Sequence, residues 1–230
     1  MNAQFPSTGP QALLWDMDGT IVDTEPYWIV AEQELAALFD ATWTHEDGIA
    51  VVGQGLPYTA TRMQERGVEL DLHDIIEALT TRVLEQLDQG VPWRPGALEL
   101  LTEAQDAGYR QVLVTMSIRR MALKIAELIP GRPFSFVVSG SDVTHSKPDP
   151  EAYVTAAEKL GVAVENCVAF EDSPSGCTSA FTSGAFTVGI PHLVSLDSAP
   201  THVVLSTLSD VTVGTIEELF RQPRLGLVSS

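Results

Sequence analysis

Cysteine and lysine are both scarce in this sequence of 230 residues. The two cysteines, Cys167 and Cys177, form no CxxC pair or cysteine–histidine cluster, which argues against a disulfide framework and favours two buried apolar side chains. Lysine and arginine together number 13 against 31 aspartates and glutamates, so the formal net charge is −18. Because no basic stripe offsets this charge, we expect no nucleic-acid partner. A phosphate site would need its own local cations or a metal.

No apolar run is long enough to approach a membrane span, and the N-terminus has neither a basic start nor a long apolar stretch. We therefore expect a cytoplasmic protein with no membrane partner. The 44% hydrophobic and 19% charged residues are typical of a packed globular chain rather than a disordered one. At this length the chain can bury a core and carry a substantial insertion.

Short apolar runs end in polar residues at several points, which is typical of buried strands that deliver side chains at their carboxyl ends. The clearest runs are 12–15, 112–114 and 167–170, with two further candidates at 134–138 and 185–190. Helical patterns separate them; in one, Asp149 is the expected N-cap, Pro150 the first helical residue and Gly161 the end. This alternation predicts an α/β fold, a doubly wound parallel sheet with helices on both faces.

The segment 24–94 breaks the alternation. Trp28, Ala31, Leu35 and Leu38 share one helical face, and a second apolar face runs from Leu72 to Leu87 without intervening strands. We therefore predict a helical cap at 24–94, inserted into an α/β catalytic core made of 1–23 and 95–230.

Two carboxylates, Asp16 and Asp18, lie one residue apart in the segment Asp-Met-Asp-Gly-Thr at the end of the first predicted strand. Like charges this close raise one pKa unless a cation compensates, which is how a nucleophilic carboxylate and a general acid can stand side by side. Gly19 permits a sharp turn. An ordinary loop would explain the segment on its own equally well.

Three further groups accompany it. Thr115, Met116 and Ser117 follow the second strand, where hydroxyl and backbone N–H groups can donate to a phosphoryl oxygen, or cap a helix. Lys147, in Ser-Lys-Pro-Asp-Pro, is one of three lysines and the one suited to meet an anion. Glu171 and Asp172 end the next strand and supply the hard oxygen ligands that Mg²⁺ prefers, although Asp172 would also serve as an N-cap.

These four motifs, in this order, resemble the haloacid dehalogenase-like superfamily, specifically the subfamily with a helical cap after the first strand. The resemblance implies that Asp16 is the nucleophile and forms an aspartyl-phosphate, that Asp18 is the general acid and base, and that Thr115 and Lys147 hold the phosphoryl group. It implies substrate contacts from Met17, Gly19, Thr115, Met116, Ser117 and Lys147, and a Mg²⁺ site from Asp16, the Asp18 carbonyl, Asp172 and Glu171.

The predicted activity is Mg²⁺-dependent hydrolysis of a small phosphorylated metabolite. Dehalogenation is disfavoured because Asp18 provides a second acid, and Schiff-base phosphonate cleavage is disfavoured because no lysine precedes Lys124. A sugar phosphomutase resembling β-phosphoglucomutase is the main alternative. Such mutases carry a histidine on the first cap helix, where this chain has Trp28. The arginine expected beside the glycine-rich stretch that starts at Gly53, which would grip a second phosphate, is also missing.

Arg62 and Arg66 remain candidate cap cations, and Trp28 is either a cap-core anchor or a stacking platform. A catalytically silent phosphate-binding protein is a second alternative, disfavoured because it would have no chemical reason to keep mutually repelling carboxylates. Neither the substrate's identity nor the oligomeric state follows from the sequence.

Overall fold

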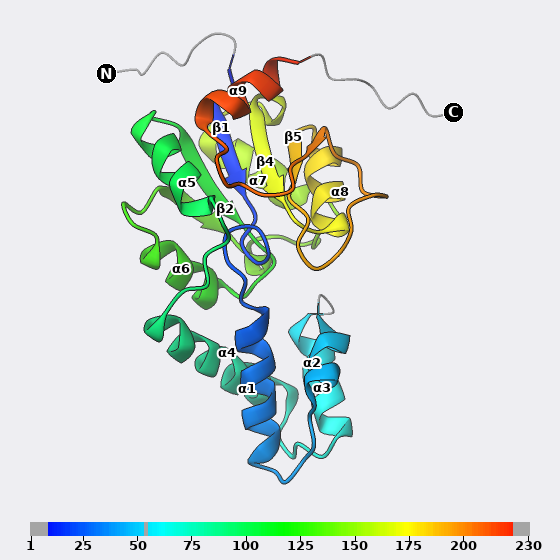
Figure 1. The fold of residues 1–230 in the computed structure, drawn as a ribbon. Helices are drawn as coiled ribbons and strands as arrows, with labels where there is room; N and C mark the ends of the chain where they lie inside the picture. The colour runs from blue at the N-terminus through cyan, green and yellow to red at the C-terminus, as the bar shows by residue number, and fades with distance from the viewer. Residues whose placement is uncertain (1–8, 53–54, 223–230) are drawn as a thin grey trace. The chain divides into compact units, whose positions relative to one another are not determined.

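The computed structural model describes residues 9–52 and 55–222. The chain divides into two compact units, one formed by the residues up to Val22 together with those from Trp93 onwards, and the other by Asp23–Pro92. The first unit contains a six-stranded parallel sheet in the order β3-β2-β1-β4-β5-β6 (Figure 1). Its strands are β1 Ala12–Trp15, β2 Arg110–Val114, β3 Phe134–Val138, β4 Cys167–Glu171, β5 Phe186–Gly189 and β6 Val203–Val204.

The predicted doubly wound sheet is confirmed, with helices on both faces. The helices of this unit are α5 Ala97–Asp106, α6 Arg119–Leu128, α7 Glu151–Leu160, α8 Pro174–Ser183 and α9 Val213–Arg221. On one face, Leu14 of β1 packs in a buried cluster with Tyr153 of α7. On the opposite face, Trp15 Nε1 donates to Gln111 Oε1 at 2.9 Å, and Gln111 Nε2 donates to the Leu101 carbonyl of α5 at 3.0 Å. Both faces of the central strands are therefore covered, as their unbroken burial requires.

The predicted start of α7 was wrong by one residue. Pro150, expected as the first helical residue, is the N-cap, and the helix begins at Glu151. Asp149 still serves the helix start, because its Oδ1 accepts the Glu151 N–H at 2.9 Å. Gly161 ends the helix as predicted, with the left-handed φ of +68° that favours glycine.

The second unit is entirely helical within its described residues. It comprises α1 Glu25–Ala37, α2 His45–Val51, α3 Leu56–Glu65 and α4 Leu72–Gln89. These helices lie between β1 and β2 in the chain, so the predicted helical insertion is confirmed. Two residues of the predicted apolar faces are exposed. Leu38 lies beyond the end of α1 and is 80% exposed, since the helix stops before the apolar stripe reaches it, and Leu72, the first residue of α4, is 39% exposed.

Glu32 of α1 is a buried carboxyl within this helical unit. Trp43 Nε1 donates to its Oε2 at 2.9 Å, and no cation is among the causes that shift its titration. Burial, opposed by that hydrogen bond and assisted by Glu25, raises the pKa of Glu32 to about 7. The folded chain therefore keeps this carboxyl protonated below about pH 7.

We expect Glu32→Gln to stabilise the chain at pH 8 and to have little effect at pH 5. Because the folded-state pKa lies above the unfolded one, the stabilising contribution of Glu32 is present below about pH 4.5 and lost as the pH rises through 7. The gain at pH 8 should be on the order of 1–3 kcal/mol. Denaturant unfolding at both pH values measures it, with the exposed Glu69→Gln as control. An equal change at the two pH values would contradict the assignment.

Candidate active site

The carboxyl ends of β1 and β4 bring three acidic side chains together. These strands are neighbours, with Trp15 opposite Phe170, so Asp16 and the pair Glu171 and Asp172 leave the same edge of the sheet. Successive strands are added on one side of β1 as far as β3 and then on its other side from β4 onwards, so the strand order switches between β1 and β4, which is where open α/β sheets form their ligand sites. Ligand atoms of Asp16, Glu171 and Asp172 lie within 4.8 Å of one another.

The Lys147 ammonium lies among these carboxylates and is almost fully buried. Its Nζ donates to Asp16 Oδ1 at 2.7 Å, to Glu171 Oε1 at 2.7 Å and to the Val114 carbonyl at 3.0 Å. Burial opposes the charged form, but the two carboxylates prevail and raise the pKa of Lys147. The lysine therefore stays charged and connects the ends of β1, β2 and β4.

Glu171 is held by a partner that the sequence did not indicate. The Tyr153 hydroxyl of α7 donates to Glu171 Oε1 at 2.6 Å, the same oxygen that accepts from Lys147. Burial first, and then the charge of Asp16, raise the pKa of Glu171 to about 7, against the opposing effect of Lys147. Tyr153 is fully buried, and the need of a buried phenol for a hydrogen-bond acceptor is the signal that could have indicated this contact.

Two glycines make room for the acidic side chains. A Cβ on Gly19, whose φ is +84°, would lie 2.0 Å from Asp172 Oδ2, and one on Gly176 would lie 1.9 Å from Glu171 Oε2. Burial, together with the charges of Asp16 and Glu171, raises the pKa of Asp172 to about 9. One ammonium is thus too little positive charge for this cluster, which suits the addition of a cation. The N-cap of α8 is Ser173, not Asp172.

Asp18 has different surroundings from Asp16. Ser117 Oγ donates to Asp18 Oδ2 at 2.6 Å, and the Ser117 N–H donates to Thr115 Oγ1 at 3.0 Å. The segment after β1 that carries Asp18 is therefore in contact with the segment after β2 that carries Thr115 and Ser117. Met17 is fully buried, so only its main chain is available to a substrate, whereas Met116 is half-buried.

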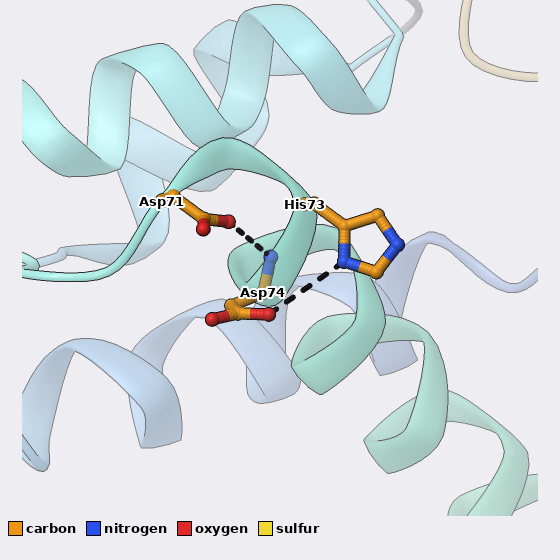
Figure 2. Close-up of side chains that lie close together, drawn as sticks. All are labelled: Asp71, His73 and Asp74. Carbon is orange, nitrogen blue, oxygen red and sulfur yellow. Dashed lines mark hydrogen bonds and ion pairs between the residues drawn. The ribbon is translucent and has the colours of Figure 1, made fainter.

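Two other clusters of potential metal ligands occur among the described residues, and both are explained by local structure. In Figure 2, the Asp74 N–H donates to Asp71 Oδ1 at 2.9 Å and His73 Nδ1 lies 3.6 Å from Asp74 Oδ1, which is an exposed helix start. The other cluster comprises His145, Asp149 and Glu151, and there the Glu151 carboxylate accepts hydrogen bonds from the main-chain N–H groups of Thr144 and His145. The buried cluster of Asp16, Glu171 and Asp172 differs because its charges come from separate strands.

The cap candidates lie within the helical unit. Arg62 pairs with Glu65, and Arg66 pairs with Asp47. Both arginines line a hollow of about 80 Å³ together with Trp43, Asp47, Ala50, Val51 and Tyr58. Trp28 is half-buried on α1, and Gly53, which entered the argument against a mutase, lies outside the described residues.

Comparison with known proteins agrees with this arrangement. Residues 10–184 match the family of haloacid dehalogenase-like hydrolases. Among curated proteins, a phosphorylated carbohydrates phosphatase from Thermotoga maritima is 30% identical over 76% of this chain and 82% of its own. Hexitol phosphatase B from Escherichia coli is 26% identical over 94% of this chain and 96% of its own.

Solved structures show the same fold. CbbY from Rhodobacter sphaeroides, in complex with phosphate, has a TM-score of 0.78 at 25% identity, covering 90% of this chain and 99% of its own. A β-phosphoglucomutase from Clostridium difficile has a TM-score of 0.75 at 20% identity, covering 92% of this chain and 97% of its own.

The chain therefore belongs to the haloacid dehalogenase-like hydrolases, the family that its four motifs indicated. The two curated relatives, from Thermotoga maritima and Escherichia coli, are phosphatases, which confirms the prediction of an enzyme of this class. None of the described helices is long and apolar enough to span a bilayer.

Proposed function

We propose that this chain is a Mg²⁺-dependent phosphatase that hydrolyses a phosphorylated carbohydrate through an aspartyl-phosphate on Asp16. The observation that carries the proposal is the unequal setting of two carboxylates at one strand end. Asp16 accepts a hydrogen bond from the Lys147 ammonium, while Asp18 accepts one from the Ser117 hydroxyl. Carboxylates with such different partners suit different roles, one as nucleophile and one as proton carrier.

In the first step, an Asp16 oxygen attacks phosphorus and the bond from phosphorus to the alkoxide leaving group breaks. Asp18 gives its proton to that alkoxide, so the carbohydrate leaves as an alcohol. In the second step, Asp18 takes a proton from water, whose oxygen attacks phosphorus and releases inorganic phosphate. Asp16 is thereby restored as a carboxylate and Asp18 as an acid.

Lys147 and the segment after β2 neutralise and orient the phosphoryl group. Lys147 carries the buried positive charge at the site, which a dianionic substrate requires in a chain of charge −18. At the neighbouring strand end the Thr115 hydroxyl and the Met116 N–H are the donors for a phosphoryl oxygen, whereas the Ser117 hydroxyl and N–H are engaged with Asp18 and Thr115. Glu171, bonded to both Lys147 and Tyr153, acts as a positioning residue for the ammonium.

The donor set fits Mg²⁺. Asp16 and Asp172 offer hard carboxylate oxygens, and the Asp18 carbonyl is a further candidate, while the Glu171 oxygen nearest Lys147 is already occupied by two donors. We therefore assign Asp16, Asp18 through its carbonyl, and Asp172 as ligands, with Glu171 behind them. When bound, the ion would supply positive charge that stabilises negative charge developing on the phosphoryl oxygens.

The names of the relatives, a phosphatase of phosphorylated carbohydrates and a hexitol phosphatase, support a substrate class for this chain. Among sugar phosphates, organic acid phosphates and nucleotides, we therefore favour a sugar or sugar-alcohol monophosphate. Phosphate binding in a structural neighbour of this fold is consistent with the assignment.

We expect release of inorganic phosphate rather than isomerisation. Arg62 and Arg66 already have acidic partners within the helical unit, so neither is a free clamp for a second phosphate. The measurement incubates the enzyme with glucose 1-phosphate and a trace of the 1,6-bisphosphate, and follows glucose 6-phosphate and phosphate. A panel of hexose and hexitol monophosphates then ranks substrates by kcat/KM.

Efficient isomerisation with negligible phosphate release would overturn the hydrolase assignment and direct attention to Arg62 and Arg66. Binding of phosphate without turnover of any ester in the panel would instead support a silent phosphate-binding protein.

A further inference from the structure

A second cavity lies in the sheet-containing unit and uses none of the residues assigned to catalysis. Its volume is about 230 Å³, and it is lined by Thr20, Arg94, Pro95, Ile190, Ser206, Thr207 and Leu208. Three segments build it: the one after β1, the one before α5, and the one that connects β5 to α9, coloured orange to red in Figure 1. We propose that this cavity binds a small organic carboxylate with a short aliphatic tail.

Arg94, which lines the cavity, has no carboxylate counter-ion among the described residues. Arg94 donates to His192 Nδ1 at 2.8 Å and to the Pro191 carbonyl at 3.4 Å, and its buried Nε has no partner among the described residues. No carboxylate pairs with it in the part of the chain that the structure describes, whereas the five arginines at 62, 66, 82, 119 and 221 each have one. In a chain of charge −18, an unpaired guanidinium marks a place that an anion would fill.

The Thr20 hydroxyl in the same cavity also lacks a partner within the described part of the chain. Thr20 is fully buried, and its Oγ1 makes no hydrogen bond to any described residue. A buried hydroxyl left without a partner costs about 1–3 kcal/mol, so it is normally satisfied by solvent or a ligand. Because Thr20 and Arg94 line the same cavity, one carboxylate group is a suitable acceptor for both.

The cavity walls are joined to one another before any ligand arrives. The Arg94 N–H donates to the Ile21 carbonyl at 2.8 Å, and the Leu205 N–H donates to the Gly189 carbonyl at 2.8 Å. A Cβ on Gly96 would lie 2.1 Å from the Leu208 carbonyl carbon, so these two main chains are in direct contact. Such a preformed pocket requires little ordering on binding.

The choice of a carboxylate follows from the charge and the apolar walls. One guanidinium balances a monoanion and leaves a phosphate dianion under-neutralised in this negative chain. Pro95, Ile190 and Leu208 offer an apolar surface that an aliphatic tail would cover. The site is therefore distinct in its chemistry from the phosphoryl site at Lys147.

The test follows methyl resonances of Ile190 and Leu208 in the full chain during titration with 3-methylbutanoate. We expect saturable shifts with the carboxylate and none with 3-methylbutanamide, its neutral counterpart. Arg94→Gln should weaken binding by about tenfold or more, since a hydrogen bond to a charged group is lost. Thr20→Val, which keeps the shape and removes the hydroxyl, should weaken it several-fold. Arg221→Gln removes the same charge away from the cavity and should leave affinity unchanged.

The absence of a saturable shift in the unaltered chain would overturn the proposal, as would equal binding of the amide. Equal affinity in Arg94→Gln and Thr20→Val would also overturn it. If inorganic phosphate produces the same shifts more tightly than the carboxylate, the cavity is a phosphate site and the proposed ligand class is wrong. Should Arg94→Gln fail to fold, Thr20→Val and the amide comparison decide the matter.

Discussion

Asp16→Asn should reduce the rate of phosphate release by about 10⁴-fold or more, as expected for loss of a nucleophile. The amide keeps the shape and one oxygen that can still accept from Lys147, at present 2.7 Å from Asp16 Oδ1. It also removes one of three clustered negative charges, so the melting temperature should be equal to or higher than that of the unaltered chain. Assays of phosphate release and thermal unfolding measure both effects.

Asp106→Asn is a matched control, because Asp106 is exposed on α5 and contributes nothing to the site.

Asp18→Asn should behave differently from Asp16→Asn. It keeps the nucleophile and loses the proton carrier, so an activated ester should phosphorylate the enzyme slowly and the acyl-phosphate should accumulate. Substantial steady-state turnover by Asp16→Asn would refute the covalent mechanism.

Removal of Mg²⁺ should have the second-largest effect. Excess chelator should lower kcat/KM by about 10²–10³-fold, because the ion contributes several kcal/mol of charge stabilisation in such reactions. Adding Mg²⁺ back should restore activity, and in the absence of substrate it should raise the melting temperature, since the proposed site exists only in the folded chain.

Asp172→Asn should abolish that thermal stabilisation by Mg²⁺, whereas Asp142→Asn should preserve it. Asp142 is a suitable control because it is also a hydrogen-bonded aspartate of the same unit, paired with Arg119 away from the carboxylate cluster. Full turnover in excess chelator would contradict the metal assignment. Unchanged stabilisation in Asp172→Asn would place the ligand elsewhere.

The predictable part of this molecule is the part that depends on short stretches of chain. Apolar runs that end in polar residues predicted the strands, and the carboxyl ends of parallel strands share one edge of the sheet, where Asp16 and Asp172 lie together. Gly19 was expected for a sharp turn, and its φ of +84° agrees. The additional reason for glycine there, the approach of Asp172, depends on a residue far along the chain.

The partners of buried polar groups were not predictable in the same way. Lys147 lies 131 residues from Asp16 in the chain, and no local pattern specifies that their side chains bond, or that Tyr153 shares the same glutamate. The two-residue strand β6 is too short for any alternation of apolar and polar residues to show. The burial expected of Leu38 was wrong because apolar periodicity does not predict where a helix ends, and α1 ends one residue before it.

The insertion begins and ends at neighbouring points of the core. Val22 and Trp93 form an antiparallel bridge, and the Asp23 N–H donates to the Pro92 carbonyl at 2.9 Å. A segment whose two ends are already held together adds little loop-closure entropy when its length or sequence changes. The helical segment can therefore be lengthened, shortened or exchanged for another while the carboxylates after β1 and β4 stay in place, so that the insertion and the core are free to diverge separately.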